Sequence, residues 1–311
     1  MKGMVVSLKK ILVIGSLNLD IVAETSHVPA TGETVIAKYG GQFPGGKGAN
    51  QSCAIARLGG DIEMLGAIGN DDAGEYLLKN LSDSGVNVNN IKRASHEPTG
   101  QAWIILNELG NNSIVVLQGA NGCVDIPYIE SMRSAFDKAD IIILQLEIPL
   151  ETVMFAAKLA KALGKTVILD PAPAVSNLPT SLLTNTDYIK PNETELAMLT
   201  ECSPDDYIEG SNQLISRGAK NVIVSLGAQG VYCHQKNNKP FHKNAHIVKV
   251  KDTTAAGDSF LAAFALGLAR GDTVENSIDF AQTVASIVVT RAGAQSSIPT
   301  ADELKALSNL A

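Results

Sequence analysis

Residues 252–258 place a turn of small residues and a carboxylate at the start of an apolar helical pattern. The free N–H groups of a helix's first turn attract anions, and the helix dipole adds partial positive charge there. Because Ala255, Ala256 and Gly257 carry almost no side chain, a phosphoryl group could come close to the backbone. Asp258 would then stand within reach of an attacking hydroxyl as a general base, although helix capping alone would also explain it.

A second group of polar residues follows the apolar run Ile11–Ile14. Alternate side chains of an extended segment share a face, so Asn18 and Asp20 are predicted to lie side by side. A carboxamide next to a carboxylate can grip a vicinal diol. The alternative is that both are turn residues capping a loop.

Residues 44–50 form a Gly-rich turn that opens a helix. Residues 41–47 nearly match the spacing of a P-loop, but Gly48 stands where Ser or Thr must hold Mg²⁺, which disfavours a P-loop NTPase. The turn would instead let the backbone, Lys47 and Asn50 approach a small polar ligand. A flexible loop before a helix is the plainer interpretation.

Three weaker signals come from the ends of other apolar runs. Glu147 ends one run, and Asn192 and Glu195 are spaced to share one face at a helix start, where capping would also suit them. The segment 225–230 is a strand-to-turn stretch with glycines where a nucleotide could pass.

Along the chain, short β-rich runs alternate with helical patterns, as in a parallel sheet covered by helices. In such sheets ligands bind beyond the carboxyl ends of the strands, which is where these polar residues lie. Residues 19–43 and 99–119 break the rhythm and resemble paired strands, including Thr34–Ala37. We therefore predict a single domain over 1–311 with a small inserted β-sheet lid.

Composition excludes several classes of protein. The chain has 311 residues, a net charge of -7 and 45% hydrophobic residues, which argues for a globular protein and against nucleic-acid or anionic-membrane partners. No apolar stretch is long enough to span a bilayer, and the run after Lys9 and Lys10 is too short for a signal peptide. The four cysteines are scattered, so we expect reduced thiols and a cytoplasmic location.

Taken together, these motifs resemble the phosphofructokinase B family of carbohydrate kinases, and the ribokinases in particular. The first family signature is similar to residues 45–52 with Gly59 and Gly69, and the second to residues 252–258 with Ala262 and Ala263. The likeness extends from about Ile11 to Pro299. It implies the ribokinase-like three-layer α/β fold, with a mostly parallel central sheet flanked by helices and a small β-sheet lid.

The resemblance also implies ATP-dependent phosphorylation of the 5-hydroxyl of D-ribose. Asp258 would be the base, and the amides of Ala255, Ala256 and Gly257 would stabilise the transferred phosphoryl group. The implied sugar-binding residues are Asn18, Asp20, Gly46, Lys47, Asn50, Glu147 and Asp258. The implied nucleotide-binding residues are Asn192, Ser225, Leu226, Gly227, Ala228, Gln229, Gly230 and Gly257.

Two ions and a partner are implied by the same resemblance. Glu195 would help organise Mg²⁺ through water, as the partner ion of ATP. An activating K⁺ would lie between two loops, held mostly by backbone carbonyls at the positions of Asp252, Thr254, Val288, Arg291, Gly293 and Ser297. A homodimer formed through the lid is implied as well.

Two other functions remain open. The acceptor could be another small sugar or a nucleoside, such as deoxyribose, fructose or adenosine. The sparse aromatic content of the lid, with Trp103 as the one tryptophan of the chain, argues against a stacked nucleoside base. A catalytically silent sugar or nucleotide sensor is the alternative from another class.

Overall fold

An eight-stranded, mostly parallel sheet forms the centre of the computed structural model, which describes residues 8–107 and 112–308. In sheet order its strands are β14 (Phe241–Lys243), β13 (Val231–Gln235), β12 (Asn221–Ser225), β11 (Tyr188–Ile189), β10 (Thr166–Leu169), β9 (Ile141–Leu144), β1 (Ile11–Ile14) and β4 (Ile62–Leu65). Neighbours from β4 to β12 are parallel, whereas β12 with β13 and β13 with β14 are antiparallel. The predicted parallel sheet is therefore confirmed.

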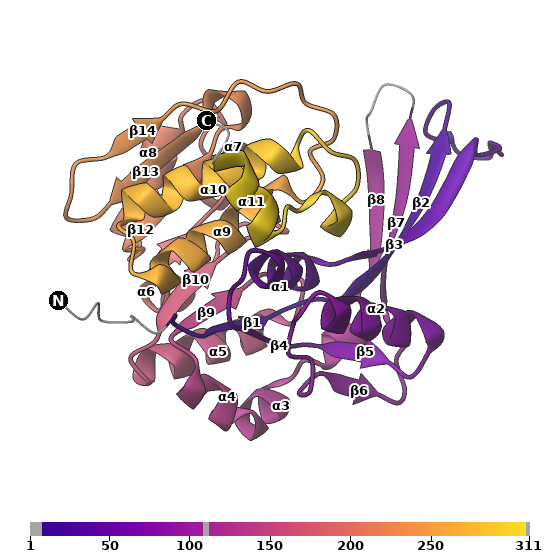
Figure 1. Cartoon of the computed structure of the whole chain (residues 1–311), viewed down its shortest axis with the longest axis horizontal. Helices are drawn as coiled ribbons and strands as arrows, with labels where there is room; N and C mark the ends of the chain where they lie inside the picture. Colours follow the sequence, from indigo (N-terminus) through magenta and orange to yellow (C-terminus); the bar gives the residue numbers. More distant parts are fainter. Residues whose placement is uncertain (1–7, 108–111, 309–311) are drawn as a thin grey trace.

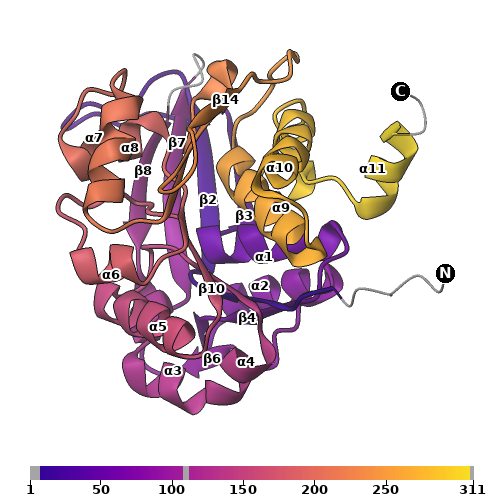
Figure 2. The ribbon, with the colours of Figure 1, turned by 90° about the vertical axis from the view of Figure 1, so that its left-hand side faces the viewer.

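Strand β1 shows why these runs are apolar throughout. Its residues are all fully buried: Ile11 and Val13 join the hydrophobic core on one face of the sheet, and Leu12 and Ile14 join the core on the other. A parallel sheet covered on both faces requires apolar side chains at every position of its buried strands. The chain therefore folds as three layers, with helices on both sides of the sheet (Figure 2).

The helices divide between the two faces. One face carries α1 (Lys47–Arg57), α2 (Asp72–Asp83), α9 (Ala256–Arg270), α10 (Val274–Val288) and α11 (Ala301–Ser308). The other carries α3 (Ile126–Ser131), α4 (Arg133–Lys138), α5 (Leu150–Ala162), α6 (Thr180–Thr184), α7 (Glu193–Thr200) and α8 (Tyr207–Ser216). The described residues also include three short 3-10 helices: η1 (Gly119–Cys123), η2 (Gly227–Gln229) and η3 (Gln295–Ser297). In the described part of the chain, no helix is both long and apolar enough to cross a bilayer.

A separate four-stranded sheet projects from the body of the molecule (Figure 1). Its order is β3 (Tyr39–Gly45), β2 (Asn18–Thr25), β7 (Gly100–Asn107) and β8 (Asn112–Leu117). Strands β2 and β7 are parallel, and the outer pairs are antiparallel. A two-stranded sheet of β5 (Ala67–Gly69) and β6 (Lys92–Ala94) lies elsewhere. The small second sheet expected beside the main one is thus present.

One predicted strand is wrong. Residues Thr34–Ala37 form no strand, and the segment that pairs with β2 is β3, beginning at Tyr39. The apolar pattern was misleading because Ile36 is 89% exposed and has no buried face to fill. That the chain is a single domain over 1–311 with 19–43 and 99–119 as a lid stays a prediction, and residues 1–7, 108–111 and 309–311 lie outside the described structure.

The carboxyl ends of four adjacent parallel strands meet at one edge of the central sheet. The chain continues from β1 into residues 15–17, from β9 into residues 145–147, from β10 into Asp170 and from β11 into Lys190. Polar and charged side chains therefore gather at this edge, as expected for an open α/β sheet.

Candidate active site

Helix α9 begins with a sharp turn at residue 255. Ala255 is its N-cap and has a φ of 58°, in the left-handed region that favours glycine. The Ala256 amide donates to the Thr253 carbonyl at 3.2 Å, whereas the Gly257 and Asp258 amides make no hydrogen bond within the described residues. Of the three amides predicted to hold a phosphoryl group, those of Ala255 and Gly257 thus donate no hydrogen bond within the described residues, and that of Ala256 closes the turn.

Asp258 lies in the first turn of α9 and is only 6% exposed. Its Oδ2 accepts a hydrogen bond from Asn50 Nδ2 at 3.0 Å, and its Oδ1 accepts one from Gln51 Nε2 at 3.1 Å. Lys47 Nζ lies 3.8 Å from Oδ1. The two amides fix the direction of the carboxylate, and each carboxylate oxygen keeps a further lone pair.

Two further amide side chains orient those of Asn50 and Gln51. Gln145 Nε2 donates to Gln51 Oε1 at 2.6 Å, and Gln295 Nε2 donates to Asn50 Oδ1 at 3.1 Å. Because the amide oxygens of Asn50 and Gln51 are used in this way, their N–H groups are directed at Asp258. Gln51, Gln145 and Gln295 have no predicted role from the sequence. The position of Gln145, directly after a buried strand, was the available signal.

Asn18 and Asp20 lie on one face of β2. Asn18 is 2% exposed, and its Oδ1 accepts from Asn121 Nδ2 at 2.7 Å. Burial, together with the negative charges of Glu147 and Asp258, raises the pKa of Asp20 to about 7. Asn121 was not singled out in the sequence, because nothing near it marks η1 as part of a site.

The Gly-rich turn brings the start of α1 against β2. Gly46 has a φ of 89°, and a Cβ there would lie 2.7 Å from the backbone nitrogen of Asn18. A Cβ at Gly45 would overlap the carboxylate of Asp20. The glycines therefore permit close packing of the turn on the strand, rather than a flexible loop.

Glu147 and Lys47 meet at the start of α1. Glu147 Oε2 accepts hydrogen bonds from the Lys47 amide at 3.0 Å and from Ser16 Oγ, so this carboxylate caps the helix. Lys47 Nζ lies 3.5 Å from Asp170 Oδ2. Burial alone would lower the pKa of Lys47, but the carboxylates of Asp170, Asp258 and Glu147 together raise it above its ordinary value.

A cavity of about 730 Å³ opens beside Asp258, which lines it. A volume of that size suits a nucleotide-sized ligand. From the predicted nucleotide and ion sets it is lined by Asn192, Glu195, Ser225, Gly227, Ala228, Gly230 and Gly257, and it also reaches Lys47, Lys190 and Asp258. The structure therefore brings together segments that are far apart in the sequence.

Two predicted nucleotide residues do not line this cavity. Leu226 is 5% exposed and packs in the core below α7 and α8, and Gln229 is an exposed residue of η2. Asn192 and Glu195 form a capping box at the start of α7: Glu195 N donates to Asn192 Oδ1 at 2.7 Å, and Asn192 N donates to Glu195 Oε2 at 2.8 Å. The capping role is therefore present, and both residues also face the cavity.

Asp252 ties together the two loops that flank the start of α9. Its Oδ1 accepts from the Thr254 amide at 2.9 Å and from Thr254 Oγ1 at 2.6 Å, and its Oδ2 accepts from the Gly293 amide at 2.8 Å. Burial would raise the pKa of Asp252, but these hydrogen bonds outweigh it and hold the pKa below its usual value. The Val288 carbonyl accepts from Arg291 N, and the Ser297 carbonyl accepts from Arg291 Nη1.

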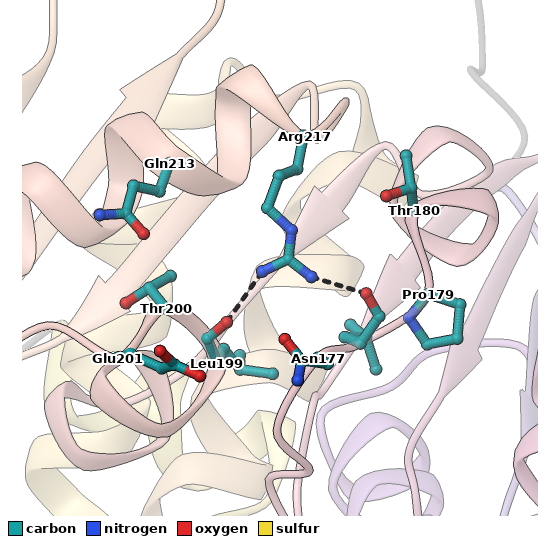
Figure 3. Close-up of a pocket in the computed structure, with 9 residues that line it drawn as sticks. Asn177, Pro179, Thr180, Leu199, Thr200, Glu201, Gln213 and Arg217 are labelled. Atoms are coloured by element: carbon teal, nitrogen blue, oxygen red, sulfur yellow. Dashed lines mark hydrogen bonds between the residues drawn. The ribbon is translucent and has the colours of Figure 1, made fainter.

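A second cavity, of about 530 Å³, lies away from this site, between the segment before α6 and the ends of α7 and α8 (Figure 3). Arg217 crosses it and donates from Nη1 to the Leu199 carbonyl at 2.8 Å and from Nη2 to the Leu178 carbonyl at 2.6 Å (Figure 3). The guanidinium thus joins two backbone segments. None of the predicted site residues lines this cavity.

The three-layer fold, with a sharp turn and a buried carboxylate at the start of α9, is that of a carbohydrate kinase. Residues 8–301 match the pfkB family of carbohydrate kinases, and the chain belongs to that family. It is therefore a phosphotransferase.

Its relatives include ribokinases along almost the whole chain. The chain is 39% identical to a ribokinase of Schizosaccharomyces pombe, over 96% of this chain and 98% of the relative. It is 34% identical to a deoxyribokinase of Salmonella typhi, over 94% of this chain and 96% of the relative. The structure of an Arabidopsis thaliana ribokinase complexed with ribose and ATP has a TM-score of 0.90 at 34% identity, covering 96% of this chain and 98% of that one.

Proposed function

We propose that this chain transfers the γ-phosphoryl group of ATP to the 5-hydroxyl of D-ribose, giving D-ribose 5-phosphate and ADP. The observation that carries the proposal is the position of Asp258. Asp258 lines the 730 Å³ cavity, and its carboxylate also lies against Asn50 at 3.0 Å and Lys47 at 3.8 Å. A base in that position has the nucleotide on one side and the sugar on the other.

Asp258 takes the proton of the sugar hydroxyl as its oxygen attacks the γ-phosphorus. The bond from that phosphorus to the bridging oxygen of ADP breaks, and ADP leaves. Phosphoryl transfer needs positioning and charge stabilisation more than covalent help. The Gly257 amide, with the turn at Ala255 and Ala256, stabilises the negative charge of the transferred group.

The sugar is held by Asn18, Asp20, Gly46, Lys47, Asn50 and Glu147. Asn18 and Asp20 accept and donate to neighbouring hydroxyls from one face of β2. Lys47 keeps its positive charge because of the surrounding carboxylates, so it donates to a sugar oxygen at neutral pH. Glu147 holds the start of α1 through Oε2, which leaves Oε1 for the sugar.

The nucleotide occupies the 730 Å³ cavity, against Asn192, Ser225, Gly227, Ala228 and Gly230. Leu226 and Gln229 support this turn from outside the cavity. Within the described residues no group of three or more His, Cys, Asp or Glu side chains could hold a metal ion. Mg²⁺, which neutralises phosphate charge when bound, would thus be held chiefly by ATP, with Glu195 contacting it through water.

The carbonyl oxygens near Asp252 suit a monovalent cation. Those of Asp252, Thr254, Arg291 and Gly293 accept no hydrogen bond within the described residues, while those of Val288 and Ser297 have one partner each and retain a lone pair. A large, weakly hydrated ion such as K⁺ requires only oxygen dipoles at a roomy spacing. Such an ion would fix the turn at residues 253–257.

We further propose a cytoplasmic homodimer in which the second sheet serves as a lid and pairs with its copy in the partner. The supporting feature is the exposed apolar surface of that sheet. Trp103 on β7 and Ile114, Val115, Val116 and Leu117 on the edge strand β8 are each about half exposed or more. An edge strand with such a surface is a site for association.

The proposal is tested by measuring ADP release with ribose, 2-deoxyribose, fructose and adenosine as acceptors. We expect ribose to give the highest kcat/KM, with the product phosphate bonded to the 5-oxygen by ³¹P–¹H correlation. The deoxyribokinase relative makes 2-deoxyribose the sharpest competitor. A higher kcat/KM for any of the other acceptors would contradict the assignment of ribose, and nucleotide binding without turnover would point to a sensor.

A further inference from the structure

The side chain of a second lysine, Lys190, lies against the start of α9. Lys190 follows β11 directly and is 4% exposed. Its Nζ lies 3.5 Å from the Gly257 carbonyl, and a Cβ at Gly257 would be 3.1 Å from that nitrogen. The ammonium therefore sits against the turn that precedes Asp258, and Lys190 lines the nucleotide cavity.

The buried ammonium of Lys190 lacks a close counter-charge. Lys190 forms no salt bridge within the described residues, whereas Lys47, the other lysine of the cavity, contacts Asp170 and Asp258. Burying an ammonium without an ion pair is costly, and three N–H donors cannot be satisfied by one carbonyl at 3.5 Å. An anion in the cavity would supply the missing partners.

The carboxylate of Asp170 interacts with Lys190 through charge alone. Asp170 is 1% exposed, and its Oδ1 has no hydrogen-bond partner within the described residues, while Oδ2 accepts from Gln51 and Lys47. Burial raises the pKa of Asp170, and the charges of Lys47 and Lys190 oppose that shift. Asp170 thus senses the charge of Lys190 without forming a salt bridge with it.

From these observations we infer that Lys190 Nζ donates to the phosphoryl group of ATP while that group is transferred, which makes Lys190 a further catalytic residue. The inference rests on the proposed function. As the acceptor oxygen bonds to phosphorus and the bond to ADP breaks, negative charge spreads over the phosphoryl and bridging oxygens. A cation fixed 3.5 Å from the Gly257 carbonyl, on the wall of the same cavity, stabilises that charge, because it is already in place and shielded from water.

The test compares Lys190→Met with Lys190→Arg and with the control Lys220→Met. Lys220 lies at the opposite end of the sheet, where its Nζ pairs with Asp187 Oδ1 at 2.8 Å. For Lys190→Met we expect kcat to fall by roughly 10²-fold, within the range for loss of one donor to a developing charge, with ribose affinity nearly unchanged. Lys190→Arg should recover part of kcat, and Lys220→Met should match the parent.

A binding measurement without any sugar separates this inference from the choice of substrate. By calorimetry, Lys190→Met should weaken binding of the non-hydrolysable β,γ-imido analogue of ATP by about tenfold and of ADP by less than about twofold, because a charge-assisted hydrogen bond contributes on the order of 1.5 kcal/mol. An unchanged kcat in folded Lys190→Met would overturn the inference. Equal losses for ADP, the analogue and ribose would also overturn it, by showing that Lys190 only maintains the structure around Asp170.

Discussion

Asn50 Nδ2 donates a hydrogen bond to Asp258 Oδ2 at 3.0 Å, although 208 residues separate the two in the sequence. The bond joins the Gly-rich turn at the start of α1 to the first turn of α9. One motif therefore supplies the carboxylate, and the other fixes its direction. Under the proposed function, a base aimed in this way needs little rearrangement when the acceptor hydroxyl arrives.

Replacing the carboxylate should stop the chemistry and spare binding. Asp258→Asn keeps the shape of the side chain but removes the proton acceptor, so we expect kcat to fall by at least ~10²-fold, with ribose and ATP still bound. ADP release and calorimetry measure the two effects. Asp272→Asn, an exposed residue beyond the other end of α9, is the control. Near-normal turnover in a folded Asp258→Asn variant would remove Asp258 from the mechanism.

Asp20 should contribute to sugar recognition. Asp20→Ala removes charge-assisted hydrogen bonds, so we expect ribose to bind more weakly by roughly 1 to 3 kcal/mol. The variant should also discriminate less between ribose and 2-deoxyribose than the parent does, if the carboxylate grips vicinal hydroxyls. Competition binding of the two sugars checks both effects. Unchanged affinity and unchanged discrimination would show that Asp20 is part of the scaffold alone.

Asp20 should also make stability depend on pH. Its pKa is raised from 3.8 to about 7 by burial and by Glu147 and Asp258, so the folded state holds a proton that the unfolded state has released. Stability that is present below about pH 4 should therefore be lost as pH rises to about 7, and Asp20→Asn should escape this loss. We expect the Tm advantage of Asp20→Asn over the parent, without ligand, to grow across that range.

The exposed Asp83 of α2 provides the matched control for that titration. Asp83→Asn should follow the parent at every pH. A Tm difference between Asp20→Asn and the parent that stays constant with pH would contradict the raised pKa.

Exchanging K⁺ for Na⁺ should lower kcat. At constant ionic strength, with Mg²⁺ and ATP held fixed, we expect a several-fold fall, because the ion steadies the turn that stabilises the transition state. Asp252→Ala breaks the hydrogen bonds to Thr254 and Gly293, so it should abolish the difference between the two salts. Asp272→Ala is the control. Equal rates in both salts would refute the cation site and leave the kinase assignment intact.

Periodicity predicted the parallel strands of the central sheet, because strands such as β1 and β9 are apolar and buried at every position. It did not predict β13 and β14, whose residues are partly polar and partly exposed. The failure at Thr34–Ala37 has the opposite cause: an apolar stretch that packs against nothing resembles a strand in the sequence. Strand β3 was missed since its residues, Tyr39–Gly45, include three glycines and a proline, and only pairing with β2 makes it a strand.

The residues of the candidate site also differ in how far the sequence alone could predict them. Residues next to strand ends or helix starts, such as Asp258 and Glu147, carry local signals. Gln51, Gln295 and Asn121 lie on helical turns without such a signal, and their importance comes from contacts across long stretches of sequence. Lys190 was equally invisible, because a lysine after a two-residue strand reads as a surface residue until its burial is known.

The link between the two sheets is only three residues long: β1 ends at Ile14, and β2 begins at Asn18. Asn18 and Asp20 thus belong to the second sheet, while Asp258 and Asn50 belong to the helical layer on the first. A sugar that contacts both pairs of residues binds only when the two sheets lie at a suitable distance from each other. The free energy of sugar binding therefore includes both the contacts and the cost of bringing the sheets to that distance. Stiffening residues 15–17 in the bound geometry would remove this cost and raise the affinity without changing any contact.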